Sequence, residues 1–471
     1  MTIARAVRTP NAAALAITAV ALVAKLPTLD QPLTENFAWR QTQTAWTALI
    51  FHQEGIDLLH PQVPVHGPPW VFGFEFPLFQ AMGALLMDAG LPPDVAMRVL
   101  GLATFLVTGW LLYLLALQLA GAAAGLASLT GFLFSPFGLL WGRTSLIEFL
   151  ATAFAVGFVL AATSWLEGRG ALSYGLALIA GIGAMLVKIT TGFFYLLPLF
   201  LYRPNGRRLD FRDWPLAPLI AVPALVGLLW VRHMDAVKAA SPATAFQTSG
   251  AMVNFNFGTP EMRWSPEVWA PFALTLLVAM TGTGLAIWIA TAAAKARHLP
   301  QGRFVAALLA VVILGPPIVL TPLYSTQDYY PAAISPAVAL LVGLGAAWAW
   351  ERRRRLIARA ALWAGAALWV LTLVVAREYW MASYQPVVDR DGALAAAAFV
   401  RERTDPGDWV VIGGRLWDPT VLYYAGRRGY ALDYRRGNER ELADLLQDGR
   451  YDLFVRCPYQ GGCEVIAANS R

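Results

Sequence analysis

The residues best suited to chemistry lie in one polar stretch that directly follows the first apolar segment. This stretch, ENFAWRQTQTAWTALIFHQEG at residues 35–55, contains Glu35, Arg40, Gln41 and Gln43. A carboxylate can accept a proton or orient a hydroxyl, and a guanidinium can bind two phosphate oxygens at once. The stretch therefore places an acid–base group and an anion-binding group beside a hydrophobic segment.

Three further charged residues border apolar runs. Glu148 lies a few residues inside one, where a carboxylate costs about 2.5–3.5 kcal/mol at the centre of a span and less near its end. It needs a cavity or a partner, and Arg143, five residues earlier, is the predicted partner. The pair either serves a site or only fixes helix packing. Lys188, between two short apolar runs, either contributes to the same site or extends to lipid headgroups.

Glu75 and a pair of tyrosines complete the candidates. Glu75 lies between phenylalanines in FEFPLFQ and is interpreted as a site residue, with a simple interfacial position as the alternative. Tyr329 and Tyr330, in QDYY, either contact a ligand or belong to an aromatic belt at the membrane boundary. No metal site is predicted, because the histidines of the first loop lack metal-ligand spacing: His52, His60 and His66.

The composition indicates which elements position these residues. The chain has 471 residues, of which 57% are hydrophobic and 14% charged, with a mean hydropathy of +0.52, whereas soluble domains are about one-quarter charged. Apolar runs of the length that crosses a bilayer recur along most of it. We therefore predict an all-α polytopic membrane protein. The net charge of +6 comes from short basic loops, which indicates orientation and argues against nucleic-acid binding.

Eleven spans are predicted, and the fifth and sixth could instead form a hairpin around Lys188 that does not fully cross. The spans are residues 11–29, 95–118, 121–140, 146–165, 171–187, 190–203, 215–232, 267–291, 303–322, 331–350 and 357–376.

The basic loops fall on one predicted side of the membrane, which is the cytoplasm by the positive-inside tendency. The opposite side receives the long loop 30–94 and the C-terminal tail. The basic loops contain Arg5 and Arg8, residues 167–169, 203–214, 295–303 and 351–355.

Two helices are expected in the long loop. In residues 35–55 the polar positions 40, 43, 44 and 47 share one face, which predicts an amphipathic helix lying at the membrane interface. Residues 74–90 predict a second such helix, with Pro77 in its first turn. Between them, HPQVPVHGPPW is too rich in proline for anything but loop.

The chain changes character after about residue 380. Helical and strand patterns alternate through GALAAAAFVRER, DPGDWVVIGG, residues 419–426, ELADLLQDG and YDLFVRC. We predict a transmembrane domain at residues 1–380 and a small extramembrane α/β domain at residues 381–471. Its cysteines, Cys457 and Cys463, form either a disulfide or two free thiols.

Three motifs together resemble one enzyme class. WRQTQTA in the first loop, EFPLFQ after it and SPFGLLWGRTSLIE further on are similar to the GT-C integral-membrane glycosyltransferases. The likeness is to the bacterial branch related to protein O-mannosyltransferases and lipid A aminoarabinose transferases. It covers residues 1–205 by motif and 303–471 by layout, and it implies a GT-C-like fold.

The resemblance implies an inverting enzyme in the cytoplasmic membrane, with its active face and C-terminus on the periplasmic side. It would move a sugar from a polyprenyl phosphate carrier to a protein, lipid or glycan acceptor in the cell envelope. The phosphate leaves as a stabilised anion, so one carboxylate suffices where a glycosidase needs two. No cofactor is expected, and a divalent cation is left open.

The site residues follow from the same resemblance. The family's acid in the first loop falls at Gln43, and an amide cannot act as a base, so the catalytic role passes to Glu75 or Glu35. Glu148 matches the family's second acidic position. The predicted binding residues are Arg40, Gln41, Gln43, Arg143, Lys188, Tyr329 and Tyr330.

Two other functions fit the same sequence. A secondary transporter would show two related halves and ionisable groups near the midplane, whereas here the polar groups gather at one face. A relative that binds the lipid carrier without catalysis is made credible by Gln43.

Overall fold

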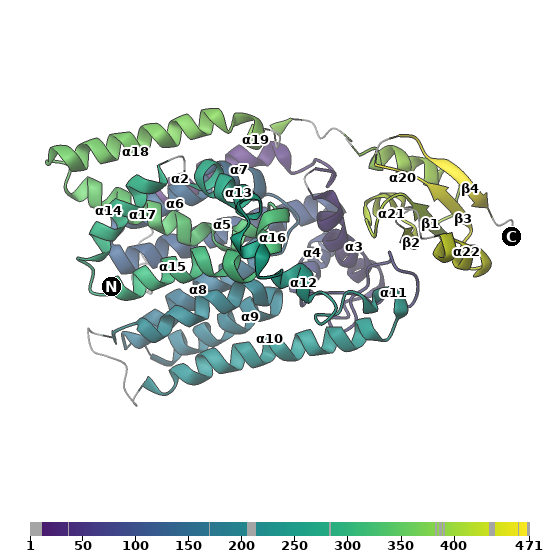
Figure 1. Cartoon of the computed structure of the whole chain (residues 1–471), viewed down its shortest axis with the longest axis horizontal. Coiled ribbons are helices and arrows are strands. Elements are labelled where there is room, and N and C mark those ends of the chain that lie inside the picture. The colour runs from purple at the N-terminus through teal and green to yellow at the C-terminus, as the bar shows by residue number, and fades with distance from the viewer. Residues whose placement is uncertain are drawn as a thin grey trace.

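The computed structural model describes residues 12–35, 37–168, 170–204, 213–281, 284–381, 384, 385, 389, 391–432, 439–459 and 461–468. The predicted cytoplasmic residues Arg5 and Arg8 and most of the loop 203–214 lie outside this range. A helical bundle forms most of the molecule, and a small domain with a sheet lies at one end of it (Figure 1).

The bundle contains fewer long helices than the prediction of eleven spans. Among the described residues, six helical runs are long and apolar enough to cross a membrane, and a bent pair would be a seventh. Shorter helices occupy the other predicted spans, so the number eleven stays a prediction. The long runs are α5 (Pro93–Ala120), α8 (Glu148–Leu166), α9 (Gly170–Leu196) with its extension to Leu201, α10 (Leu216–Ala239), α15 (Gly302–Val319) and α18 (Leu356–Val375). The bent pair is α13 (Pro266–Leu274), continued to Met280, with α14 (Leu285–Ala296). The shorter helices are α2 (Ala12–Lys25), α6 (Ala122–Leu133), α7 (Pro136–Trp141), α16 (Thr321–Thr326) and α17 (Ser335–Glu351).

The run from Gly170 to Leu201 folds back on itself at Lys188. Straight, its 32 residues would extend about 48 Å. Instead, the Tyr202 hydroxyl donates to Glu167 Oε1 at 2.8 Å, so the two ends of the run meet. Lys188 has non-helical torsions of φ −160° and ψ 94°. The predicted break around Lys188 is therefore confirmed, and this lysine lies at the tip of the turn. Whether the two arms are separate spans or the alternative hairpin that does not fully cross stays a prediction.

The described parts of the predicted cytoplasmic loops gather at the end of the bundle away from the C-terminal domain (Figure 1). There, the Gln301 amide donates to the carbonyl oxygen of Arg203 at 2.6 Å. Lys295 forms an ion pair with Glu351 at 2.5 Å. The grouping of basic loops expected from the charge pattern is thus observed in space.

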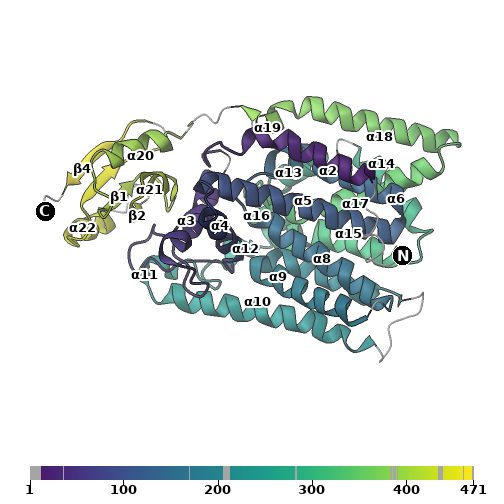
Figure 2. The ribbon, with the colours of Figure 1, turned by 180° about the vertical axis from the view of Figure 1, so that it is seen from behind.

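The helices of the long loop, α3 (Ala38–Glu54) and α4 (Leu78–Asp88), lie between the bundle and the C-terminal domain (Figures 1 and 2). Both helices form where expected, and residues 60–70 between them form a loop. Protein covers both faces of α3, because residues 40–48 are all buried, and its predicted position at the membrane interface stays a prediction. The polar face of α3 turns toward residues 61–77.

The C-terminal domain is a four-stranded sheet with helices, in the strand order β2-β1-β3-β4. β1 is parallel to both β2 and β3, and β4 is antiparallel to β3. The prediction located β1 and β3 but missed β2 and β4. The elements are α20 (Ala393–Arg401), β1 (Trp409–Gly413), α21 (Thr420–Ala425), β2 (Arg428–Leu432), α22 (Glu439–Gln447), β3 (Leu453–Arg456) and β4 (Glu464–Ala468).

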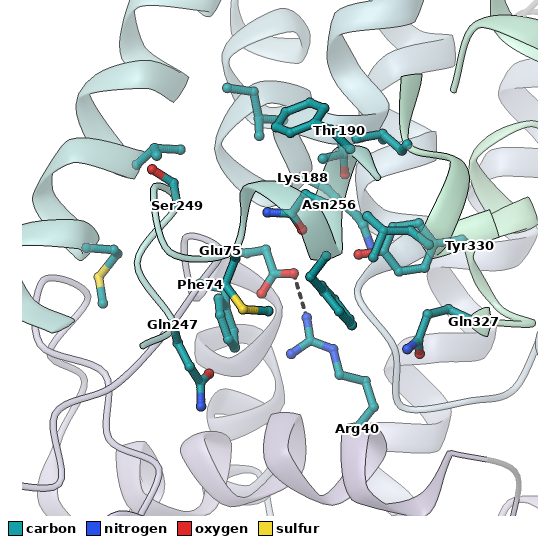
Figure 3. A pocket seen from close by; sticks show the side chains of 18 of the residues that line it. Arg40, Phe74, Glu75, Lys188, Thr190, Gln247, Ser249, Asn256, Gln327 and Tyr330 are labelled. Atoms are coloured by element: carbon teal, nitrogen blue, oxygen red, sulfur yellow. Dashed lines mark hydrogen bonds and ion pairs between the residues drawn. The ribbon is translucent and has the colours of Figure 1, made fainter. Parts of the chain in front are cut away.

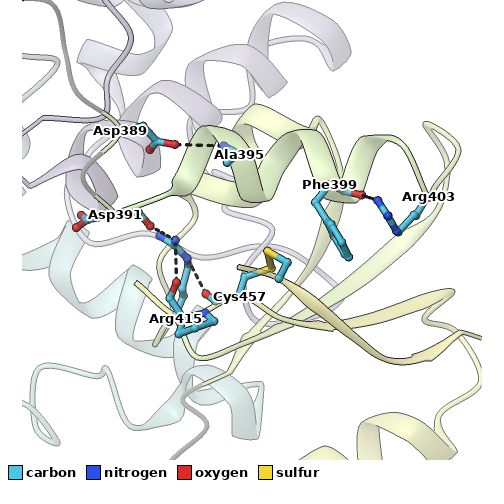
Figure 4. The surroundings of a disulfide bond; sticks show 9 residues. Asp389, Asp391, Ala395, Phe399, Arg403, Arg415 and Cys457 are labelled. Carbon is cyan, nitrogen blue, oxygen red and sulfur yellow. Dashed lines mark hydrogen bonds between the residues drawn. A yellow bond between two sulfur atoms is a disulfide. The ribbon is translucent and has the colours of Figure 1, made fainter. Parts of the chain in front are cut away.

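A disulfide closes the turn between β3 and β4. Cys457 and Cys463 are bonded, which decides between the two predicted states (Figure 4). Arg415 fixes the same corner, because its Nε donates to the Cys457 carbonyl oxygen at 2.9 Å and its guanidinium also binds the Asp391 carbonyl oxygen. Asp389 caps α20 by accepting from the Ala393 amide at 2.7 Å.

The C-terminal domain and the long loop share one hydrophobic core, which includes residues of α3, α4 and β1. The edge strand β2 also pairs with the loop, since the Ala431 amide donates to the Val65 carbonyl oxygen at 3.0 Å. At the start of α5, Asp94 accepts hydrogen bonds from Tyr423 at 2.7 Å and from Tyr424 at 2.9 Å. The domain is therefore docked through both backbone and side-chain contacts.

The double variant Tyr423→Phe/Tyr424→Phe is expected to loosen this docking, because Asp94 would lose two side-chain donors and the Leu33 amide would lose the Tyr424 hydroxyl as its acceptor. An unsatisfied buried polar group costs about 1–3 kcal/mol. Faster amide hydrogen exchange in α21 and β2 is the expected result. Tyr174→Phe, whose hydroxyl contacts Pro215 in the bundle, serves as the control. Unchanged exchange in the double variant would contradict the docking role.

Candidate functional site

A cavity of about 320 Å³ lies where α3, the Lys188 turn, α10 and the C-terminal domain meet. Figure 3 shows side chains that line it. Apolar side chains of α10 and α16 form part of its wall, including Leu228, Val231 and Leu323. Its charged groups come from segments far apart in the sequence. The cavity therefore combines a hydrophobic wall with a small polar centre, as ligand sites commonly do.

Arg40 and Glu75 form the centre of the cavity (Figure 3). Arg40 Nη2 lies 2.5 Å from Glu75 Oε1, and its Nη1 donates to Gln43 Oε1 at 2.7 Å. Burial alone would raise the pKa of Glu75, but the neighbouring Arg40 and Lys188 hold it below its usual range. Glu75 is therefore a carboxylate at neutral pH, and Gln43 helps to orient the guanidinium.

Lys188 enters the cavity from the hairpin turn and forms a buried ion pair with Glu148. Glu148 lies in the first turn of α8, where the helix dipole favours a negative charge. The ammonium lies 4.1 Å from the ring centre of Tyr330 and 5.5 Å from that of Tyr329, and both rings line the cavity. The predicted pairing of Glu148 with Arg143 is wrong.

Arg143 instead belongs to a second cluster, centred on Glu35. Arg98 binds both carboxylate oxygens of Glu35 at 2.8 Å, and Arg143 Nη2 donates to Glu35 Oε2 at 3.1 Å. Both arginines also bind backbone carbonyl oxygens at the start of the long loop, those of Gln31 and Thr28. This cluster ties the loop to α5 and to the segment before α8. It does not line the cavity.

The predicted site residues thus divide between two places. Gln41 is fully buried and accepts from the Ser145 amide at 3.0 Å, which holds the turn before α8. The cavity itself brings together Arg40, Glu75, Lys188, Tyr329 and Tyr330. Gln43 binds Arg40, and Glu148 binds Lys188. The residues placed elsewhere are Glu35, Gln41 and Arg143.

Comparison with family models and with proteins of curated function yields no match. Solved structures, in contrast, align over nearly the whole chain. ArnT from Cupriavidus metallidurans aligns with a TM-score of 0.62 at 12% identity, covering 94% of this chain and 92% of that one. The oligosaccharyltransferase AglB from Archaeoglobus fulgidus gives 0.58 at 11% identity, covering 94% and 69%. The arabinofuranosyltransferase AftD from Mycobacteria gives 0.54 at 16% identity, covering 94% and 35%.

The fold is GT-C-like. The resemblance inferred from the sequence motifs is confirmed at the level of fold, including the small C-terminal domain. At these identities the alignments describe the fold alone. Evidence for the function of this GT-C-like chain therefore comes from its own side chains.

Several cavity residues of the GT-C-like fold escaped the prediction. Part of the segment 233–266 lies in the cavity wall. Its mixture of polar and aromatic residues was the available signal. No feature of the sequence indicated that Trp417 belongs to the cavity, because it lies in the separate C-terminal domain. In the structure it lines the cavity and packs against Trp39, with 5.3 Å between ring centres. The missed polar residues are Asp235, Lys238, Gln247, Ser249, Asn256 and Gln327.

No group of three or more His, Cys, Asp or Glu side chains with metal-binding geometry occurs within the described part of the chain. The three histidines of the first loop contact different partners. His52 pairs with Asp88, His60 with Asp57, and His66 lies against Gln247 beside the cavity.

Acidification is expected to destabilise the protein through His66. Burial lowers the pKa of His66 to about 4, whereas an unfolded histidine titrates near 6.5. Between these values only the unfolded chain binds the proton, so stability falls as the pH falls through this window. At pH 5 the loss is about 2 kcal/mol. Thermal unfolding from pH 7 to 5 should show a weaker pH dependence in His66→Phe; equal dependence in both proteins would contradict the assignment.

Proposed function

We propose that this protein is an inverting glycosyltransferase that moves a sugar from a polyprenyl phosphate carrier to an acceptor hydroxyl. One observation carries the proposal: Arg40, Glu75 and Lys188 meet in a single cavity that also has an apolar wall. Two cations suit a phosphate, a carboxylate suits a hydroxyl, and the wall suits an isoprenoid chain.

The lipid part of the proposal is supported by structures that share the fold. ArnT from Cupriavidus metallidurans has been solved with undecaprenyl phosphate, and AglB from Archaeoglobus fulgidus with dolichol-phosphate and an inhibitory peptide. A polyprenyl phosphate is the ligand common to both. The proposed acceptor is a hydroxyl group of a protein, a lipid or a glycan.

The proposed reaction needs one carboxylate as a base and no general acid, because the leaving phosphate is a stable anion. The acceptor oxygen attacks the anomeric carbon as the bond from that carbon to the phosphate oxygen breaks. The electron pair leaves with the phosphate, which Arg40 and Lys188 stabilise, and the acceptor proton passes to Glu75. Attack opposite the leaving group inverts the anomeric centre.

Substrate binding would also activate the base. In the described structure Arg40 is bound to Glu75 at 2.5 Å, which holds the pKa of Glu75 low. A carrier phosphate that draws Arg40 toward itself weakens this pairing. The buried carboxylate then becomes a stronger proton acceptor, because burial without a counter-charge raises its pKa.

The proposal places the cavity on the periplasmic side of the cytoplasmic membrane. The basic loops at the far end of the bundle support this orientation. The proposed step uses no cofactor or metal ion. We therefore expect the rate of sugar transfer to be unchanged by EDTA.

The decisive experiment uses the full-length protein in nanodiscs with undecaprenyl phosphate, undecaprenol and undecaprenyl-phosphate sugars. We expect binding of the phosphate but not of the alcohol, and transfer of a sugar with inverted configuration, detected by mass spectrometry and NMR. Binding without transfer from any donor would favour a carrier-binding relative. Solute uptake into proteoliposomes without transfer would favour a transporter.

A further inference from the structure

Lys238 is a buried cation of the cavity to which the proposed reaction gives no role. It lies near the end of α10, is 4% exposed and lines the cavity. The proposed reaction uses only Arg40 and Lys188 as cations. A buried lysine is costly unless counter-charges and hydrogen bonds compensate for its lost hydration. A charged group that is kept buried in the wall of a cavity is therefore a candidate for ligand binding.

The ion pair with Asp235 provides only part of this compensation. Lys238 Nζ lies 3.3 Å from Asp235 Oδ1, and the Ser249 amide donates to the same oxygen at 2.8 Å. The Ser249 hydroxyl donates to the other oxygen, Oδ2. One carboxylate thus serves three donors, and among the described residues no second carboxylate lies within ion-pair distance of Lys238. An ammonium group has three hydrogens to donate, so an anion carried by a ligand would complete its surroundings.

Lys238 is also close to the proposed base. Its ammonium lies 4.9 Å from the ring centre of Phe74. Phe74 directly precedes Glu75 in the chain, and both residues line the cavity. The negative charge of Glu75 acts on Lys238. An acceptor whose hydroxyl is bound at Glu75 would therefore have this ammonium as a neighbouring positive charge.

The two lysines of the cavity lie on different sides of the base. Figure 3 shows Ser249 on one side of the Glu75 carboxylate and Tyr330 on the other. Lys188 belongs to the Tyr330 side, because its ammonium lies 4.1 Å from the centre of that ring. Lys238 belongs to the Ser249 side, because both contact the same carboxylate oxygen. Inversion requires the acceptor to approach opposite to the leaving phosphate, so the side with Lys238 is the acceptor side.

We propose that Lys238 binds an anionic group of the acceptor, a phosphate or a carboxylate close to the hydroxyl that receives the sugar. This inference rests on the proposed function, which names only a hydroxyl of a protein, a lipid or a glycan. Lys238 takes no part in the transfer of the sugar or the proton. Its contribution is to favour acceptors that carry a negative charge.

The test uses pairs of acceptors that present similar hydroxyls and differ in charge. The pairs are glycerol with glycerol phosphate, methyl glucoside with methyl glucuronide, and a neutral serine peptide with one that has aspartate beside the serine. They represent lipid headgroups, glycans and proteins. The wild-type protein in nanodiscs, supplied with undecaprenyl-phosphate sugars, is expected to show a lower KM for the anionic member of at least one pair. The pair with this preference identifies the source of the anionic group.

Lys238→Met removes the charge and keeps most of the length of the side chain. We expect the KM and the dissociation constant of the preferred anionic acceptor to rise about 10–100-fold, as for the loss of a hydrogen bond to a charged group. The constants of its neutral counterpart and of undecaprenyl phosphate should not change. Lys238→Arg keeps the charge and should retain most of the affinity for the anionic acceptor.

Lys295→Met is the matched control, because Lys295 is also a buried lysine in an ion pair, with Glu351 at 2.5 Å. It does not line the cavity, so no acceptor constant should change. A measurement on the wild-type protein tests the same inference without any variant. Raising the ionic strength screens charges, so it should raise the KM of the anionic acceptor and leave that of the neutral one unchanged.

The outcomes separate this inference from the proposed function. Sugar transfer with equal KM values within every pair would overturn the inference and leave the proposed function intact. An equal loss for both members of a pair in Lys238→Met, or a loss of carrier binding, would also overturn it. Selective binding of an anionic acceptor without any sugar transfer would overturn the proposed function and leave the role of Lys238 intact. The absence of both transfer and selective binding would overturn both.

Discussion

Replacing Glu75 by glutamine is expected to lower the rate constant of sugar transfer about 10²–10⁴-fold, the usual contribution of a general base. Glutamine retains the shape of the side chain but accepts no proton. Binding of undecaprenyl phosphate should not weaken, because Arg40, which now binds Glu75 at 2.5 Å, becomes free to bind the phosphate. A large loss of kcat with retained carrier affinity, measured in nanodiscs, would thus identify a catalytic group.

The control for this variant is Glu378→Gln. The Glu378 side chain is 80% exposed and pairs only with its neighbour Arg377 among the described residues, so activity should stay at the wild-type level. Full activity in Glu75→Gln would remove the catalytic assignment. A joint loss of folding, carrier binding and activity would show instead that the Arg40–Glu75 pair is mainly structural.

Replacing Glu35 by leucine is expected to produce the largest loss of stability. The side chains of Arg98 and Arg143 are 0% and 1% exposed, and both would face each other without their shared carboxylate. Removing one member of a buried ion pair costs about 3–5 kcal/mol. The measurement is thermal unfolding in detergent or nanodiscs, followed by intrinsic tryptophan fluorescence.

Glu54→Leu is the matched comparison, because it also removes a carboxylate from an ion pair with an arginine, Arg428. That carboxylate side chain is 45% exposed, and exposed pairs contribute about 0–1 kcal/mol, so a small effect is expected. Glu35 was one of two candidate bases in the first loop. A Glu35→Leu protein that remains fully stable yet inactive would return the catalytic role to Glu35.

The distinction between Glu35 and Glu75 shows where sequence reasoning reached its limit. Both lie in the same loop, and the motif position that could have chosen between them holds Gln43. The structure separates them, since Glu75 opens onto the cavity and Glu35 is enclosed by arginines from α5 and the segment before α8. Similarly, Arg143 was the nearest cation to Glu148 in sequence, whereas the actual partner, Lys188, is 40 residues away.

The protein segments that cover α3 could not be predicted from the sequence for a related reason. Its polar and apolar faces are those of an interfacial helix, and the helix forms as predicted at Ala38–Glu54. What covers it comes from elsewhere, because α21 packs against it and Thr42 contacts Thr420 at 3.0 Å. An amphipathic pattern predicts that the two faces of a helix have different surroundings. It does not indicate whether the apolar face contacts lipid or protein.

By itself the sequence determined the polytopic helical character, the grouping of the basic loops, the helix break at Lys188, the C-terminal α/β domain and the likeness to GT-C enzymes. These properties depend on local hydropathy, loop charge and short motifs, which can be read without long-range contacts. Only the tertiary structure decided which carboxylate faces the cavity, which cation each acid meets, and that Trp417 and Gln247 share its wall. Those choices depend on charges and rings brought together from separate segments, where burial and Coulomb attraction select partners by distance in space and not along the chain.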